Sequence, residues 1–248
     1  MALKVVMLGG TKGIGRALAR RLAARGDRLH LLGRDLDDLA RCATDLQARM
    51  PAPGTVTFSH CDLEEPDTFA AAVDDAAAAL GGFDTAVITA GLFATQPRLE
   101  EDLAFTQRLL TVNFANTVLF CEHLRRSLLA RGGGTLCVFS SVAGDRGRKP
   151  VILYGSSKAG LSTYLEGLDH KFRAAGLKTI CVKPGFVRTG MTDGLPEPPF
   201  AADPDQVAAS VVKAIDAGTP MIYAPPIWAL VMLVIRNLPR AVMRKVGF

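Results

Sequence analysis

The sequence predicts one α/β domain with a doubly wound, parallel, seven-stranded sheet, followed by a short apolar and basic helical extension. Short apolar runs alternate with helical patterns along most of the 248 residues. This alternation is typical of a parallel sheet covered by helices on both faces. The length suits a single domain, and neither a long linker nor an internal repeat interrupts the pattern. We therefore assign residues 1–225 to the domain and residues 226–248 to the extension.

The strand candidates are short and almost entirely apolar, as expected of strands that are buried on both faces. In chain order they are Leu3–Leu8, Leu29–Leu32, Thr55–Cys61, Thr85–Thr89, Thr135–Ser140, Lys178–Lys183 and Met221–Ala224. Helical patterns fall between them, at Lys12–Arg25, Leu36–Met50, Pro66–Leu80, Glu100–Arg131, Ile152–Ala175 and Pro204–Ala217.

The composition is that of a globular protein with a large core, since 49% of the residues are hydrophobic and 21% are charged. The net charge of +5 is scattered. It suits an anionic cofactor, an acidic substrate or an anionic membrane surface, but it forms no stripe of the kind that binds nucleic acid.

Five widely spaced cysteines without a CxxC pair predict neither a disulfide framework nor a metal site. The N-terminus runs straight into a strand without a signal-peptide pattern, so we expect a cytoplasmic protein.

The first strand is followed by a glycine-rich turn, Leu8-Gly9-Gly10-Thr11-Lys12-Gly13-Ile14-Gly15, which opens a helix. Glycines at Gly9, Gly13 and Gly15 let the backbone turn sharply and approach a pyrophosphate, which then rests on the helix N-terminus. The spacing is Gly-x-x-x-Gly-x-Gly. A structural turn without a ligand is the alternative.

The end of the second strand predicts which dinucleotide is bound. An acidic residue at this position binds the ribose 2′-hydroxyl of NAD, whereas a basic one accommodates the 2′-phosphate of NADP. Here the strand ends at Gly33 and is followed by Arg34, and Lys12 in the glycine turn is a second cation. Asp35 follows, but it is equally suited to cap the next helix. These residues favour NADP(H) over NAD(H).

Two further positions suggest a cofactor and a proton donor. Asp62 closes the third strand and could accept a hydrogen bond from an adenine amino group, or it could cap the following helix. Tyr154 and Lys158 are four residues apart in a helical pattern, so they share one helix face. An ammonium beside a phenol lowers the pKa of the phenol, which makes Tyr154 a candidate proton donor. A solvated helix face is the alternative.

Taken together, these residues resemble the short-chain dehydrogenase/reductase family over essentially the whole chain. The matching positions stand in the family's order and spacing, with Ser141 thirteen residues before Tyr154. They are Gly9, Gly13, Gly15, Asp62, Ala90-Gly91, Asn113, Ser140-Ser141, Tyr154, Lys158, Pro184-Gly185 and Thr189. The resemblance implies a Rossmann-type fold, a nicotinamide cofactor and a homodimer or homotetramer assembled through the long helices.

The resemblance also implies roles for individual residues. Tyr154 would be the general acid in carbonyl reduction and the base in alcohol oxidation. Lys158 would lower its pKa and hold the nicotinamide ribose, Ser141 would bind the substrate oxygen, and Asn113 would hold a water that connects Lys158 to solvent. No metal is required. The cofactor would contact Gly9, Thr11, Lys12, Gly13, Ile14, Gly15, Arg34, Asp62, Leu63, Ala90, Gly91, Tyr154, Lys158, Pro184, Gly185, Val187 and Thr189.

The chain departs from the family's pattern in two places. Leu8 stands where the family usually has a threonine, and Ile88-Thr89-Ala90-Gly91 replaces Asn-Asn-Ala-Gly. Thr89 can keep one polar contact to neighbouring backbone, whereas Ile88 cannot, so the support of the nucleotide loop is in doubt. The four catalytic positions are all filled, which counts against the alternative of a non-catalytic NADP-binding sensor or scaffold.

Three stretches are expected to shape the substrate site. The loop between Ser141 and Tyr154 carries Arg146, Arg148 and Lys149, which either attract a phosphate or carboxylate on the substrate or belong to a solvated loop. Residues 186–202 are rich in proline and glycine and predict a mobile lid over the nicotinamide. The third stretch is the extension.

The extension combines nine apolar residues, Ile227–Ile235, with the cations Arg236, Arg240, Arg244 and Lys245. Such a run is too short to span a bilayer, which needs roughly 20 residues. It could lie in a membrane interface with Trp228 at headgroup level, or it could cover the substrate pocket or a subunit interface. Pro239 should break or kink the helix.

The basic loop and the extension also resemble the decaprenylphosphoryl-ribose 2-epimerase reductase subunits, which reduce a 2-keto sugar on a polyprenyl phosphate. The similar segments are Leu8-Gly9-Gly10-Thr11, Ser140-Ser141-Val142-Ala143-Gly144-Asp145-Arg146 and Leu238-Pro239-Arg240. This resemblance implies a peripheral enzyme at the inner membrane surface. In preference to this function, we expect a broader NADP(H)-dependent reductase of hydrophobic ketones, which acts on small-molecule carbonyl or alcohol substrates.

Overall fold

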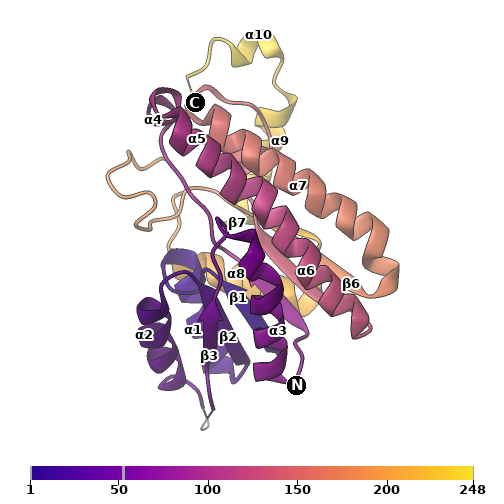
Figure 1. Ribbon diagram of the computed structural model, residues 1–248. Coiled ribbons are helices and arrows are strands. Elements are labelled where there is room, and N and C mark those ends of the chain that lie inside the picture. Colours follow the sequence, from indigo (N-terminus) through magenta and orange to yellow (C-terminus); the bar gives the residue numbers. More distant parts are fainter. Residues whose placement is uncertain (1, 52–53, 248) are drawn as a thin grey trace.

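The computed structural model describes residues 2–51 and 54–247 and contains one parallel sheet of seven strands. The strand order is β3-β2-β1-β4-β5-β6-β7, and every neighbouring pair is parallel (Figure 1). The order reverses between β1 and β4, where a ligand crevice is expected beyond the carboxyl ends of the strands. The strands are β1 (Lys4–Leu8), β2 (Arg28–Gly33), β3 (Thr57–His60), β4 (Thr85–Ile88), β5 (Gly134–Phe139), β6 (Leu177–Pro184) and β7 (Met221–Ala224).

Helices cover both faces of the sheet, so the predicted doubly wound α/β fold is confirmed. One face carries α1 (Gly13–Arg25), α2 (Leu36–Gln47) and α8 (Pro204–Ala217). The opposite face carries α3 (Phe69–Leu80), α6 (Thr117–Ala130) and α7 (Ile152–Phe172).

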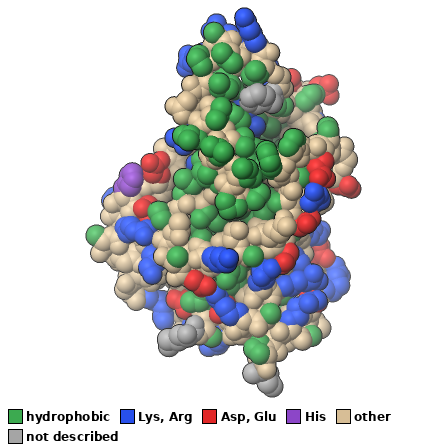
Figure 2. All heavy atoms as spheres, turned by 180° about the vertical axis from the view of Figure 1, so that it is seen from behind, with side chains coloured by type: hydrophobic (Ala, Val, Ile, Leu, Met, Phe, Trp, Pro, Cys, Tyr) green, Lys and Arg blue, Asp and Glu red, His purple; other side chains and the backbone are tan. Residues whose placement is uncertain are grey.

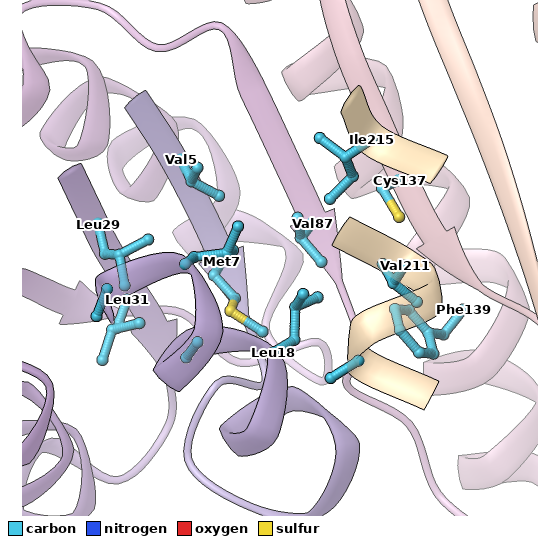
Figure 3. Packing of buried hydrophobic residues seen from close by; sticks show 14 of the residues in the cluster. Val5, Met7, Leu18, Leu29, Leu31, Val87, Cys137, Phe139, Val211 and Ile215 are labelled. Atoms are coloured by element: carbon cyan, nitrogen blue, oxygen red, sulfur yellow. The ribbon is translucent and has the colours of Figure 1, made fainter. Parts of the chain in front are cut away.

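The apolar side chains of each strand alternate between two cores, because successive residues of a strand point to opposite faces. Val5 and Met7 of β1 pack with Leu18 of α1 in the first core (Figure 3). Val6 and Leu8 belong to the second core, under α3, α6 and α7. Burial on both faces explains why the strands read as continuous apolar runs in the sequence.

The prediction of one helix over Glu100–Arg131 is wrong. The segment contains α4 (Gln96–Glu101), α5 (Leu103–Leu110), a π-helical turn at Thr111–Asn116 and α6. Asp102 separates the first two, because its backbone leaves the helical region and its side chain accepts a hydrogen bond of 2.9 Å from the Phe105 amide. An aspartate that caps a new helix in this way ends the preceding one.

The extension folds into α9 (Ile227–Asn237) and α10 (Arg240–Met243), and Pro239 separates the two as predicted. Trp228, Met232 and Ile235 of α9 pack on Val142 and Tyr223. None of the helices in residues 2–51 and 54–247 is long and apolar enough to cross a membrane.

Candidate active site

A cavity of about 1600 Å³ opens at the carboxyl ends of the strands. This volume exceeds the 300–1,000 Å³ usual for one small ligand, so it can hold a dinucleotide and a substrate together. Every predicted cofactor-binding residue, from Gly9 to Thr189, lies in its wall, and so do Ser141, Tyr154 and Lys158. Residues that are far apart in the sequence therefore meet around one space.

The glycine turn requires its glycines because the backbone packs tightly there. Gly9 has φ of 93°, and a Cβ on it would lie 2.6 Å from the Ala90 amide nitrogen. A Cβ on Gly15 would lie 2.1 Å from the carbonyl oxygen of Gly9. The Thr89 hydroxyl donates to that same oxygen at 2.8 Å, so the loop support that the sequence left in doubt is supplied by Thr89.

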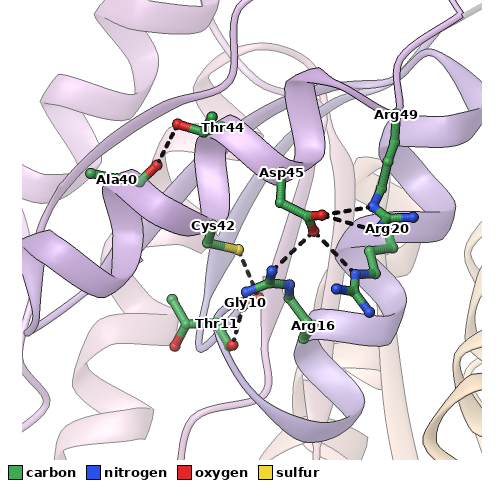
Figure 4. Close-up of polar contacts among 9 residues, drawn as sticks. All are labelled: Gly10, Thr11, Arg16, Arg20, Ala40, Cys42, Thr44, Asp45 and Arg49. Atoms are coloured by element: carbon green, nitrogen blue, oxygen red, sulfur yellow. Dashed lines mark hydrogen bonds and ion pairs between the residues drawn. The ribbon is translucent and has the colours of Figure 1, made fainter.

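A second set of contacts fixes the turn from the side of α2 (Figure 4). Asp45 accepts hydrogen bonds from Arg16 and Arg20 of α1 and from Arg49. These bonds, with that of Arg49 first, hold the pKa of the Asp45 carboxyl well below its usual range. The guanidinium of Arg16 also donates to the Thr11 carbonyl at 3.4 Å, so the ion cluster holds α1, α2 and the glycine turn together.

The N-terminus of α1 fits a pyrophosphate. Its first turn contains no acidic residue, and among the described residues no side chain caps it. The amide groups of a first helical turn lack intrahelical acceptors, and the helix dipole favours a negative charge there. Gly13 and Ile14 of this turn line the cavity.

Lys12 and Arg34, predicted to bind a 2′-phosphate, both lie in the cavity wall beside carboxylates. Lys12 Nζ is 3.3 Å from Asp38, and Arg34 is 3.6 Å from Glu64. The side chains of Lys12 and Arg34 are 83% and 59% exposed, so these ion pairs are screened and weak. Both cations therefore stay available to an anion.

Asp35 and Asp62, which were considered as helix caps, differ in their roles. The Asp35 carboxylate accepts from the Asp38 amide at 2.9 Å, which is the capping role considered for it. Asp62 accepts from the Glu64 amide at 3.0 Å and lines the cavity, but it does not cap the next helical turn, Pro66–Thr68, whose N-cap is Glu65.

The candidate catalytic residues come from the end of β5 and the first turns of α7. Lys158 is buried, and its Nζ donates to the Phe139 carbonyl at 3.0 Å and lies 5.9 Å from the centre of the Tyr154 ring. Ser141 accepts from the Ala143 amide at 3.1 Å, and its hydroxyl lies close enough to Tyr154 to hydrogen-bond the phenol. A Ser, a Tyr and a Lys thus share one wall of the cavity.

Two residues that the sequence did not single out hold Tyr154 in place. The Phe93 ring meets the Tyr154 ring edge-on, with 5.1 Å between the ring centres. Gln96 accepts from the Leu153 amide at 3.1 Å at the beginning of α7. No motif or spacing connects residues 93 and 96 with residues 153 and 154, so only the folded chain reveals these contacts.

Burial has the largest effect on the pKa values of Tyr154 and Lys158. It raises the pKa of Tyr154 to about 12, against the opposing hydrogen bond from Ser141, and it lowers the pKa of Lys158 to about 8. The expectation that Lys158 brings the pKa of Tyr154 below its usual value is therefore not met in the structure. At neutral pH Tyr154 keeps its proton, which is the form that a proton donor needs.

Asn113 lies in the π-helical turn and is buried behind Gly91. Its Oδ1 accepts from the Leu92 amide at 2.7 Å, and its Nδ2 donates to the Leu92 carbonyl at 2.8 Å. The side chain thereby positions the loop that follows β4. The predicted water at Asn113 stays a prediction.

The three stretches expected at the substrate end surround the cavity. The segment 186–202 closes on itself through a bridge between Val187 and Ala202, and Arg188 pairs with Glu197 and Asp203. Phe186, Leu195 and Phe200 of this segment line the cavity, as do Trp228 and Ile235 of α9.

The sheet order, the glycine turn and the cavity are those of a dinucleotide-binding α/β fold, and Ser141, Tyr154 and Lys158 line the same cavity. The short chain dehydrogenase profile matches residues 4–199. The chain belongs to the short-chain dehydrogenase/reductase family and is an NAD(P)-dependent oxidoreductase.

The relatives agree with this assignment. An uncharacterized oxidoreductase of Mycobacterium tuberculosis is 35% identical over 248 residues, covering 98% of this chain and 97% of that protein. Carbonyl reductase family member 4 of Xenopus tropicalis is 28% identical, covering 85% of this chain and 90% of that protein. The solved structure of a short-chain type dehydrogenase/reductase from Mycobacterium ulcerans, 22% identical, superposes with a TM-score of 0.81 over 90% of this chain and 89% of that chain.

The low pKa of Lys158 predicts the pH dependence of the reductive reaction. The ammonium form is complete below about pH 8 and is lost as the pH rises through that value, because burial lowers the pKa. We expect kcat/KM for the reduced cofactor, which reports the free enzyme, to be level below pH 8 and to fall above it. Tyr154, with its pKa at about 12, should not titrate in this window. A profile that stays level to pH 10 contradicts the assignment.

Proposed function

We propose that this protein uses NADP(H) to interconvert a ketone and a secondary alcohol. The observation that carries the proposal is the shared cavity: the glycine turn lies at one end, and Ser141, Tyr154 and Lys158 lie together at the other. A hydrophobic carbonyl compound suits the walls near these three residues, where Phe93, Trp228 and Ile235 are exposed to the cavity. The similarity to carbonyl reductase family member 4 of Xenopus tropicalis agrees with a carbonyl substrate.

Ser141, Tyr154 and Lys158 have different chemical roles in the proposed reaction. A nicotinamide bound in the cavity would supply the hydride in reduction and accept it in oxidation. In reduction the hydroxyls of Ser141 and Tyr154 bind the carbonyl oxygen and stabilise the negative charge that develops on it. Tyr154 then transfers its proton to that oxygen, and its phenolate is reprotonated from solvent. Lys158, charged below about pH 8, stabilises the phenolate and holds the ribose hydroxyls. In alcohol oxidation each step runs in reverse.

Tyr154→Phe tests the proton transfer. The variant keeps the ring that packs on Phe93 but has no proton to give, so turnover should fall by roughly 10²–10⁴-fold, the usual contribution of a general acid. NADPH oxidation with a panel of ketones measures the loss, and quenching of protein fluorescence by NADPH should show nearly unchanged binding. Turnover at the wild-type rate in this variant would refute the role of Tyr154. Tight NADPH binding by the wild type without turnover of any carbonyl would favour a sensor or scaffold.

Arg34→Ala tests the preference for NADP(H). Because Arg34 is proposed to bind the 2′-phosphate, its loss should raise the KM for NADPH by about 10-fold or more, as expected for a hydrogen bond to a charged group. The KM for NADH should change little. Arg41→Ala is the matched control, since Arg41 is an exposed arginine that pairs with Asp38. Equal effects on the two cofactors would remove Arg34 from the phosphate site.

A second candidate is a reductase that works at a membrane surface, and the outer face of α9 favours it. Leu230 and Leu233 are 61% and 59% exposed, and neither lines the cavity. Residues 226–248 carry four cations and no acidic side chain. Figure 2 displays hydrophobic side chains gathered over the upper half of one face of the molecule, with Lys and Arg at its top. An apolar helix face flanked by cations binds anionic lipid.

Vesicle flotation distinguishes this candidate. The protein should float with vesicles containing an anionic lipid and remain behind with neutral ones. Replacement of Leu230 and Leu233 by Glu on the exposed face should abolish flotation.

A homodimer or homotetramer could cover the same face, and in that case the mass in solution should exceed that of one chain and drop in the same variant. Failure of the unaltered protein to float with anionic vesicles would end the membrane proposal.

A further inference from the structure

The three cations of the loop between Ser141 and Tyr154 have different environments. Arg146 donates to the carbonyl oxygens of Arg236 and Leu238, at 3.5 and 3.1 Å. Lys149 donates to the Arg244 carbonyl at 2.7 Å. These two side chains therefore bind the ends of α9 and α10, whose last carbonyls lack intrahelical donors. The third cation is Arg148.

Arg148 lies in the wall of the cavity with its guanidinium partly buried. Its Nε is fully buried, and within residues 2–51 and 54–247 no acceptor lies within hydrogen-bond distance of it. Burial lowers the pKa of Arg148, while the charge of Asp145 opposes that shift. An arginine nevertheless stays charged in proteins, and the buried Nε of this half-buried side chain has no hydrogen bond to compensate for its removal from water.

The nearby carboxylate that could neutralise Arg148 is already engaged. Asp145 accepts from Lys183 Nζ at 2.6 Å through one oxygen and from the Tyr223 hydroxyl at 2.6 Å through the other. Lys183 and Tyr223 come from β6 and β7, so both carboxylate oxygens of Asp145 are bonded to residues of the sheet. Arg148 therefore lies in the cavity wall, while Asp145, the carboxylate closest to it in the chain, is bonded to Lys183 and Tyr223.

We infer that Arg148 is a specificity-determining residue that binds a carboxylate or phosphate of the substrate. The guanidinium fork matches either group with two parallel hydrogen bonds. This inference rests on the proposed function and adds the substrate class: a ketone with an apolar body and an anionic group.

The cofactor's own phosphates do not account for Arg148. It follows β5, whereas the glycine turn follows β1 and Arg34 follows β2, on the other side of β4 in the sheet. It lies in the loop between Ser141 and Tyr154, which are proposed to bind the substrate oxygen. Arg148 therefore belongs to the substrate end of the cavity.

Ligand binding tests the inference without turnover. Decanoate, decyl phosphate and decanol share an apolar chain, and the first two supply the two anionic groups. With saturating NADP⁺, calorimetry should give the wild type at least 10-fold tighter binding of one or both anions than of decanol. Arg148→Met should remove that preference, and Arg148→Lys should restore part of it. Arg126→Met, which removes an equal charge from an exposed position of α6 outside the cavity wall, should retain it.

Kinetics with oxo acids and their methyl esters provides the second measurement. The ratio of kcat/KM for acid over ester should exceed 10 in the wild type and fall toward 1 in Arg148→Met. No turnover of any ketone together with an intact anion preference in binding would refute the proposed function alone. Turnover without an acid preference, or a preference that persists in Arg148→Met, would overturn the inference about Arg148. Preference for decanoate alone identifies a carboxylate substrate, and preference for decyl phosphate alone a phosphate.

Discussion

The close docking of α7 against the end of β5 is the contact on which the candidate active site depends. The Ser140 hydroxyl is 2.9 Å from the Lys158 carbonyl and 2.7 Å from the Ser162 hydroxyl, so it ties the strand end to two successive turns of the helix. The backbones approach so closely that a Cβ on Gly144 would lie 2.6 Å from the Lys158 carbonyl carbon. A Cβ on Gly155 would lie 2.7 Å from the Ala143 carbonyl oxygen. Without these small residues α7 would move outward and separate Tyr154 and Lys158 from Ser141.

The same close packing accounts for the proton affinities. Lys158 reaches back beneath α7 to the Phe139 carbonyl, and this path takes its ammonium out of water. Desolvation disfavours the charged form of any group, so it raises the pKa of a phenol and lowers that of an amine. Half-buried Tyr154 therefore holds its proton at neutral pH, which is the form that the proposed general acid needs. The geometry that positions the donor also keeps it protonated.

Much of the fold and of the site could be predicted because both follow from local patterns. Apolar runs marked all seven strands, and a parallel sheet brings the residues after each strand to one edge, so Gly9, Asp62, Gly91 and Ser141 had to meet. The break at Asp102 was missed because a helical propensity pattern continues through it, and one capping hydrogen bond decided the outcome. The contacts of Phe93 and Gln96 with α7 depend on tertiary packing between segments about 60 residues apart, and single-sequence patterns carry no such information.

The contacts of the loop between Ser141 and Tyr154 explain why the charge pattern alone did not identify a substrate-binding residue. In the sequence Arg146, Arg148 and Lys149 are equivalent cations, but the helix ends of the extension need donors for their last carbonyls, and two of the three are placed to provide them. The extension thus selects which cation remains for a ligand. It also builds part of the cavity wall through Trp228 and Ile235. A change in how α9 and α10 pack would therefore alter the pocket and the charge within it together. Divergence in this C-terminal segment could change substrate class while leaving Ser141, Tyr154 and Lys158 untouched.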